Sequence, residues 1–305
     1  MRAETASRPH SRGLFRKWEG WGRRVAAALV PFLLAACHAG GDEPEARPAL
    51  WLAEDADTRL YILGTMHALP RGTGWDSAAV GEAIGAADEL VMELAPPELA
   101  RAGDVFRALA PRDAPLAVER RLPEAALAPY RALEVRGGDA LDDWAIMVLM
   151  GQQAARRAKL SPTDGVETGL TAAFRKAGKP IAGLETAEAQ LMLFETLDAA
   201  TQRALLTRAA ARADRAPQDI AALTAAWARG DVAALERLIN EDVEAVPAAR
   251  RALITDRNRA WADWAVRRMD RPGTVLMAVG AGHLVGPGGV PAMLEASGLK
   301  VTRIQ

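Results

Sequence analysis

Short apolar runs alternate with longer helical patterns along most of this chain. Each run spans five or six residues and is bounded by turn-forming residues, which predicts a buried strand. The first two runs flank an acidic stretch at 54–58 and predict a hairpin, and a last edge strand is expected at 300–304. The apolar runs lie at 49–53, 59–63, 89–94, 180–185 and 274–279.

The segments between these runs carry apolar residues at helical spacing. From 98 to 178 we expect helices that are broken by prolines, Pro129 among them. From 186 to 270 the pattern is helical throughout, with Thr186 and Asp231 at helix starts. Further helices are expected to begin near residues 77, 142, 165 and 287.

Strands that alternate with helices indicate an α/β fold, with a largely parallel central sheet and an N-terminal antiparallel hairpin. The helical stretch at 186–270 is too long for a simple crossover, so we expect it to form an inserted lobe. No linker rich in Pro, Gly or Ser divides residues 49–305, and a single domain is therefore predicted over this range.

The N-terminal residues have the pattern of a targeting segment rather than of a fold. Residues 1–36 carry seven Lys or Arg and two Glu ahead of a run of apolar or small residues. Cys37 follows Leu34-Ala35-Ala36, the setting in which lipoprotein signal peptidase cuts and a diacylglycerol is attached to the thiol. We expect a signal peptide at 1–36, a lipid such as palmitate carried on Cys37, and a flexible tether at 37–48. The alternatives are a plain signal anchor or a buried cysteine, although the apolar run is shorter than the ~20 residues that span a bilayer.

Charge and composition narrow the expected location and partners. Loss of seven of the 38 Lys and Arg and two of the 39 Asp and Glu would leave 31 against 37, a net charge of −6. No basic stripe with interleaved aromatic residues is present, so nucleic acid is not an expected partner. The expected location is the periplasm-facing cell envelope, and His38 after Cys37 favours the outer membrane.

Two of the apolar runs end in the same motif, Gly-x-x-His. Gly64-Thr65-Met66-His67 ends the second run, and Gly280-Ala281-Gly282-His283 ends the last one. The remaining histidines, His10 and His38, belong to the predicted leader and tether. Both histidines of the expected domain therefore follow strands, and we expect the two motifs to meet at one site.

Open parallel sheets bind ligands beyond the carboxyl ends of their strands. At those ends the sequence places Glu93 and Glu185 near the two histidines. Gly64, Gly280 and Gly282 would permit sharp turns and close approach of neighbouring groups. Two imidazoles and a carboxylate suit a divalent metal such as Mn, Co, Zn or Fe, which can acidify a bound water and polarise a carbonyl.

Each of these residues also has a purely structural interpretation. A histidine at a turn can be a hydrogen-bonded structural side chain, and Glu185 precedes a helix start, where it would interact with the helix dipole. Arg257 lies in a predicted helix beside Asp256 and would by default form a surface or packing ion pair. The chain has no Gly-x-Ser-x-Gly elbow, phosphate-binding loop or cysteine nucleophile, and the glycines before His283 lack the context of a dinucleotide fingerprint.

Five motifs follow one another along the chain: Gly64 to Pro70, the strand ending at Glu93, Gly183-Leu184-Glu185-Thr186, Thr255-Asp256-Arg257-Asn258 with Trp261, and Gly280 to Gly286. In this order they resemble the TraB/GumN family, which is related to the Tiki metalloproteases, over residues 49–305. The resemblance implies a fold similar to erythromycin esterase and the ChaN haem-binding proteins. It also implies divalent-metal-dependent proteolysis that relies on both Gly-x-x-His motifs and a glutamate, which fall on His67, His283 and Glu93. Glu167 departs from the family pattern, in which many relatives carry Asp after Gly-Val, and this puts a direct role for that position in doubt.

These observations predict a lipid-anchored envelope hydrolase that depends on Mn, Co or Zn and acts on a peptide or protein substrate. His67 and His283 would bind the metal or polarise the scissile carbonyl, and Glu93 would be a ligand or the base. Arg257 would stabilise developing negative charge, with Asn258 as a further pocket residue. The alternative is a non-catalytic lipoprotein that holds haem, a metal or an export partner in the same pocket.

Overall fold

The computed structural model describes residues 45–305, apart from the side chains at 240–244. The predicted signal peptide at 1–36, Cys37 and most of the predicted tether lie outside the described residues, so they stay predictions. In the described range, no helix combines the length and the apolar character that crossing a membrane requires.

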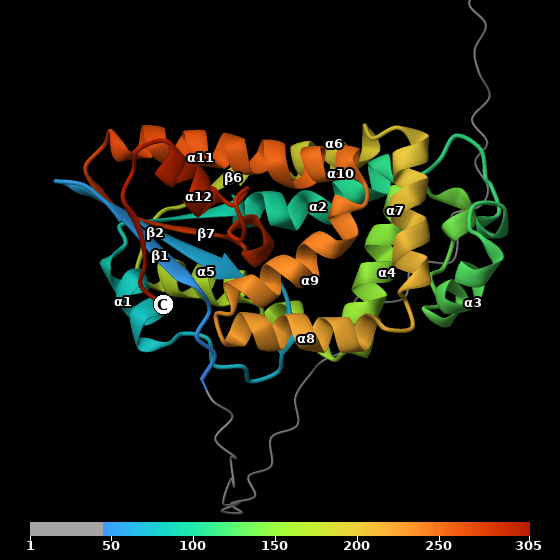
Figure 1. The fold of residues 1–305 in the computed structure, drawn as a ribbon, viewed down its shortest axis with the longest axis horizontal. Helices are drawn as coiled ribbons and strands as arrows, with labels where there is room; N and C mark the ends of the chain where they lie inside the picture. The colour runs from blue at the N-terminus through green and yellow to red at the C-terminus, as the bar shows by residue number, and fades with distance from the viewer. Residues whose placement is uncertain (1–44) are drawn as a thin grey trace, which may run out of the picture. The chain divides into compact units, whose positions relative to one another are not determined.

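A mostly parallel six-stranded sheet forms the centre of the described part of the fold (Figure 1). In order across the sheet, its strands are β6 (Ile181–Glu185), β4 (Glu89–Leu94), β7 (Gly273–Gly280), β2 (Thr58–Thr65), β1 (Leu50–Glu54) and β8 (Val301–Arg303). The first four run parallel, whereas β1 pairs antiparallel with β2 and with the edge strand β8. The predicted α/β class, N-terminal hairpin and edge strand are thus confirmed.

Side chains that alternate along the strands face two separate cores. On β2, Tyr61 and Leu63 face one core, while Leu60 and Ile62 face the other. Because the sheet is covered on both faces, its strands appear in the sequence as continuous apolar runs. The helices over the first face are α1 (Ala78–Ala86), α5 (Val166–Lys176), α8 (Ala216–Ala228) and α9 (Val232–Glu244), and those over the second are α11 (Asp256–Met269) and α12 (Val290–Ala296) (Figure 1).

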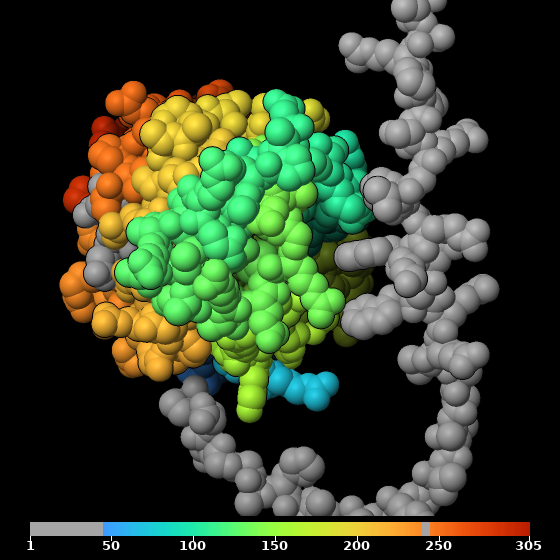
Figure 2. All heavy atoms as spheres, turned by 90° about the vertical axis from the view of Figure 1, so that its right-hand side faces the viewer, coloured from blue at the N-terminus to red at the C-terminus, as the bar shows by residue number. Residues whose placement is uncertain are grey.

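A helical lobe lies beside the sheet but does not coincide with the predicted insert at 186–270, because α8, α9 and α11 of that range pack on the sheet. In this lobe α3 (Glu124–Ala132) and α4 (Asp143–Arg157) share a third core with α7 (Ala199–Ala211). Figure 2 shows green residues of the earlier segment beside yellow and orange residues of the later one on this side of the molecule. The lobe is therefore built from two segments on either side of β6. The remaining helices are α2 (Pro96–Leu109), α6 (Ala187–Glu195) and α10 (Pro247–Arg250), with a π-helical turn at Arg251–Thr255 between α10 and α11.

Two local features differ from the predictions. Pro129 lies inside α3 instead of ending a helix. It removes one backbone hydrogen bond, but Ala126 and Tyr130 are buried in the lobe core and keep the helix packed. A small second sheet of β3 (Leu69–Pro70) and β5 (Leu160–Ser161) was not predicted, because two-residue strands carry no apolar period.

Trp227 connects α8 to the central sheet and supplies a first test. Its indole is fully buried, and Nε1 donates a 2.9 Å hydrogen bond to the carbonyl of Gly64. Because Trp227→Phe removes a buried donor, we expect the free energy of unfolding in urea to fall by about 1–3 kcal/mol. Trp264→Phe, at a partly buried position on α11, is the matched control and should cost less. Equal losses in the two variants would contradict this assignment.

Candidate active site

Strand register brings the predicted residues to one edge of the sheet. Thr65 at the end of β2 pairs with Gly280 at the end of β7, and Leu94 at the end of β4 pairs with Glu185 at the end of β6. Because β7 lies between β2 and β4, both Gly-x-x-His motifs and Glu93 leave the sheet next to one another.

Gly280 is the point at which three of the predicted residues converge. A Cβ placed on Gly280 would lie 3.1 Å from Oε1 of Glu93, 3.7 Å from Cδ2 of His283 and 3.8 Å from Nε2 of His67. The two imidazole atoms are therefore at most 7.5 Å apart, the sum of 3.7 and 3.8 Å. The Gly280 N–H also donates to Oε1 of Glu93 at 2.8 Å. A side chain at position 280 would crowd the Glu93 carboxylate, which explains sterically why glycine stands there.

The other two predicted glycines make packing contacts instead. A Cβ on Gly64 would lie 3.3 Å from Cβ of Ala281, and a Cβ on Gly282 would lie 3.1 Å from Cγ2 of Ile239 on α9. Both neighbours are apolar side chains. The structure thus places Gly64 and Gly282 beside the site, where they allow its segments to pack closely.

Arg257 occupies the centre of the cluster and uses its whole hydrogen-bonding capacity there. Nε and Nη2 donate to the two carboxylate oxygens of Glu185 at 2.8 and 2.9 Å, and Nη2 also donates to Oε2 of Glu93 at 2.7 Å. Nη1 donates to Nε2 of His283 at 3.0 Å and to the carbonyl of Leu253 at 3.2 Å. These five hydrogen bonds, to four residues, match the five N–H donors of a guanidinium. The guanidinium also lies over the Trp261 ring, 4.7 Å from its centroid.

His283 is held as a neutral imidazole. Asn258 donates from Nδ2 to the carbonyl of Gly288 at 2.7 Å, so its Oδ1 faces Nδ1 of His283 at 2.6 Å and accepts that proton. Nε2 then presents its lone pair to Arg257. Burial, helped by the nearby Arg257 charge and opposed by Glu93, lowers the pKa of His283 from 6.5 to about 4.

Glu93 is held as a buried carboxylate. Burial alone would raise its pKa, but the neighbouring His283, His67 and Arg257 side chains and the Gly280 N–H outweigh this and bring the pKa to about 2. Gln190 of α6 donates to Oε2 of Glu93 at 3.0 Å and to Oε2 of Glu185 at 3.2 Å. Both carboxylates are therefore hydrogen-bonded within the cluster, as buried carboxylates must be.

His67 differs from the rest of the cluster because its side chain is 69% exposed. Its Nδ1 lies 2.7 Å from Oε1 of Glu167, in the first turn of α5, and Thr65 donates to the same oxygen. Gly165 allows this approach, since a Cβ there would lie only 2.2 Å from the carbonyl oxygen of His67. Within the described part of the chain, Nε2 of His67 makes no hydrogen bond and lies 3.8 Å from where a Cβ on Gly280 would stand.

The Glu167 carboxylate controls the titration of His67. Its charge, against an opposing effect of burial, raises the pKa of His67 from 6.5 to about 9. Water at the exposed ring screens part of this attraction. The folded-state pKa lies above the unfolded one, so the pair stabilises the fold at mildly acidic pH and loses that effect as pH rises through about 9.

The hydrogen bonds of both imidazole rings fit a metal site, but the spacing of the side chains does not complete one. Metal-binding histidines usually donate Nδ1–H to a carboxylate or carbonyl and bind through the other nitrogen, as His67 with Glu167 and His283 with Asn258 would. However, no group of three or more His, Cys, Asp or Glu within residues 45–305 is spaced to hold a metal ion. Arg257 also lies against Nε2 of His283 and would have to withdraw. The divalent metal stays a prediction.

Two residues of the cluster lie outside the predicted set. The sequence put a direct role for Glu167 in doubt, yet this residue contacts His67 directly. The Gly-Val-Glu sequence at the start of α5 was the available signal, because it places an acidic residue in a first helical turn. Gln190 has no signal in the sequence beyond its helical context, since its role depends on how α6 packs over the strand ends.

Replacing Glu167 tests the electrostatic description of His67. In Glu167→Gln the negative charge is lost, so the pKa of His67 should fall by at least about one unit in an NMR titration of its ring signals. Glu188→Gln is the matched control, because Glu188 also lies in the first turn of a helix, α6, but is exposed. An unchanged His67 pKa in Glu167→Gln, or an equal shift in the control, would contradict the assignment.

Comparison with known proteins identifies the family of this chain. No curated protein and no solved structure gave a significant match. The family model described as the TraB/PrgY/gumN family matches residues 49–303, which takes in all of the strands and site residues described above. This chain therefore belongs to the TraB/PrgY/gumN family.

Proposed function

We propose that this chain is a hydrolase in which His67 transfers the proton. The observation that carries the proposal is the contrast between His67 and the rest of the cluster. His67 is exposed, oriented by Glu167 through Nδ1, and has no hydrogen-bond partner at Nε2 among the described residues. Arg257, Glu93 and Glu185 are instead saturated by one another. A histidine oriented by a carboxylate is the usual arrangement of a general base.

The proton balance of the proposed reaction is simple. The neutral form of His67 takes a proton from water at Nε2 while the water oxygen bonds to the carbonyl carbon of the substrate. The same proton then passes to the leaving nitrogen or oxygen as its bond to that carbon breaks. Glu167 keeps the ring in place and stabilises the imidazolium between the two steps. Because Glu167 also raises the pKa of His67, the neutral form increases as pH approaches about 9.

Arg257 supports the proposed site mainly by positioning other groups. Its charge is balanced by Glu93 and Glu185, and its five donors already have partners. To stabilise negative charge on a substrate, it would have to release one of them. Its present contacts instead fix the Glu93 carboxylate and add to the effect of burial that keeps His283 neutral.

A divalent metal is the alternative within this proposal. If Nε2 of His67, Nε2 of His283 and Oε1 of Glu93 bound one, Nε2 of His67 would be a ligand and no longer the proton acceptor. Such a metal would lower the pKa of bound water and polarise a carbonyl. The Nδ1 contacts of both imidazoles support this assignment. The proposed substrate is a peptide or protein of the cell envelope, where a lipid on Cys37 would anchor the chain. Membership of the TraB/PrgY/gumN family supports this proposal.

Hydrolysis is tested with purified protein and a mixed peptide library, with added Mn, Co or Zn and with a chelator. We expect cleavage that falls at least about a hundredfold in His67→Asn, because the proton acceptor is lost. The fold should persist, since the His67 ring is mostly exposed. Glu188→Gln should cleave like the unaltered protein. Protein that cleaves nothing under any condition, but carries haem or a metal from its host, would contradict a hydrolase and favour the binding role.

Metal binding has a separate readout, elemental analysis of the purified protein after dialysis against Mn, Co or Zn. We expect Asn258→Ala to bind the metal about ten to a hundred times more weakly, because the His283 ring loses the partner that orients it. The variant should therefore contain less metal after dialysis. Gln152 is an exposed amide residue on α4 outside the predicted ligand set, and Gln152→Ala is the matched control. Equal metal retention by Asn258→Ala and the unaltered protein would contradict the predicted metal site.

A further inference from the structure

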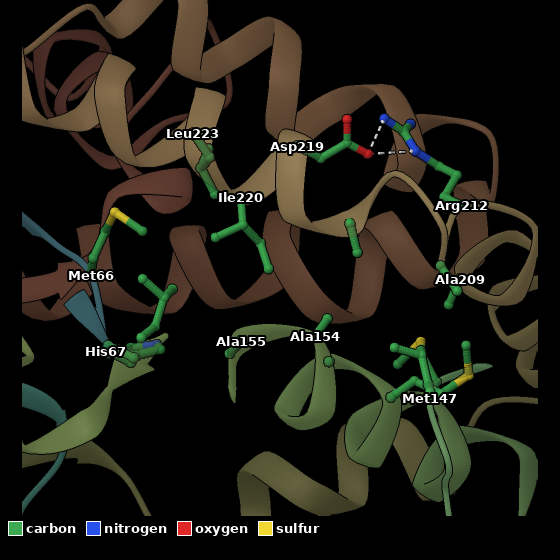
Figure 3. Close-up of a pocket in the computed structure, with 17 residues that line it drawn as sticks. Met66, His67, Met147, Ala154, Ala155, Ala209, Arg212, Asp219, Ile220 and Leu223 are labelled. Atoms are coloured by element: carbon green, nitrogen blue, oxygen red, sulfur yellow. Dashed lines mark hydrogen bonds and ion pairs between the residues drawn. The ribbon is translucent and has the colours of Figure 1, made fainter. Parts of the chain in front are cut away.

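An apolar cavity of about 450 Å³ opens beside His67, on the side of the helical lobe (Figure 3). Met66 and His67 lie at one end, after β2. Arg212, Asp219 and Met147 lie toward the other end, with α4 below and α8 above in this view. His67 is therefore shared between the cavity and the cluster of charged residues at the strand ends.

The cavity exists because small side chains face one another across it. Gly151, Ala154 and Ala155 lie on the same face of α4, at the i, i+3 and i+4 spacing of a helix. Opposite them, Ala213 and Ala216 line the wall where the chain enters α8. Larger residues at these positions would fill the space, so the room next to His67 follows directly from the sequence.

The lining has the chemistry of an aliphatic site. Its polar side chains are His67 at one end and, at the other, Arg212 and Asp219, which are hydrogen-bonded to each other at 3.0 and 3.3 Å. The walls between them are alanine, leucine, isoleucine and methionine, without an aromatic side chain among the lining residues. Such walls give no polar partners to a sugar or to an extended peptide backbone, which would lose hydrogen bonds with water.

The size and adaptability of the cavity also suit a chain rather than a compact group. Pockets for small ligands commonly measure roughly 300–1,000 Å³ and are mainly apolar. Met66, Met147 and Met150 line this one, and unbranched methionine side chains adapt to flexible apolar ligands.

We propose that this cavity holds an aliphatic chain of the substrate, so that the bond to be cleaved lies at His67. The inference rests on the proposed hydrolase function and deepens it. The substrate class is an amide or ester that carries a long aliphatic chain next to the scissile bond. The chain would bury its methylene groups between α4 and α8, while the carbonyl remains at the polar end, near Nε2 of His67.

Gly151 offers a variant that fills the cavity without disturbing the fold. A Cβ at Gly151 would meet no atom within 4 Å, and the residue is exposed at the cavity wall. Gly151→Leu also replaces a helical glycine by a strong helix former, so the protein should fold at least as well. Gly103→Leu on α2 is the matched control, because Gly103 is an exposed helical glycine outside the cavity lining.

The test is isothermal titration calorimetry of the whole protein with octanol and with butanol. Each added methylene should tighten binding by about fourfold, so octanol should bind far more tightly than butanol. Gly151→Leu should weaken octanol binding at least about tenfold, whereas Gly103→Leu should bind it like the unaltered protein. Absence of octanol binding, or equal affinity in Gly151→Leu and the unaltered protein, would overturn the inference.

The calorimetry does not depend on turnover, so the two proposals fail separately. Octanol binding that is lost in Gly151→Leu, in a protein that cleaves no substrate, would retain the aliphatic site and overturn the hydrolase. Peptide cleavage that needs His67, in a protein that does not bind octanol, would retain the hydrolase and overturn the aliphatic site.

Discussion

The site depends on one buried cation. Arg257 has five N–H donors, and each has a partner contributed by Glu93, Glu185, His283 or the Leu253 carbonyl. One buried and one mostly buried carboxylate without such a partner would be strongly destabilised, and removing one member of a buried ion pair typically costs 3–5 kcal/mol. The guanidinium on α11 balances the charge of the two glutamates at the strand ends, together with hydrogen bonds from Gln190 and the Gly280 N–H. Burial, helped by the same guanidinium, keeps His283 neutral and leaves His67 as the accessible titrating group.

The two histidines of the site have different environments, and this difference connects the fold to its chemistry. The parallel sheet brings both Gly-x-x-His motifs to one edge, but their environments differ: His283 is buried and tied to Asn258, whereas His67 is exposed and tied to Glu167. Two residues with the same local motif thus acquire pKa values displaced in opposite directions. Separated pKa values are a common property of catalytic pairs. The apolar cavity then adjoins the exposed histidine rather than the buried one.

Most of the sheet was predictable because its strands are buried on both faces and stand out as apolar runs. The strand at 89–94 and the hairpin before His67 are clear cases. The extent of the lobe was not predictable, because no local sequence pattern shows that α3 and α4 pack on α7, which follows β6 in the chain. At the site, His67, Glu93, Glu185, Arg257 and His283 were found from strand ends and motifs. The Glu167 contact spans 100 residues and depends on the close approach that Gly165 permits, so spacing alone could not reveal it.

The pH dependence of kcat/KM, measured for the unaltered protein and for Glu167→Gln, tests the central claim about His67 most directly. If neutral His67 accepts the proton and Glu167 raises its pKa, kcat/KM of the unaltered protein should rise with pH toward about 9. In Glu167→Gln the rise should occur at lower pH, with a lower maximum, because the ring is less well oriented. Identical pH profiles, or a kcat/KM that falls over this range in the unaltered protein, would contradict the account.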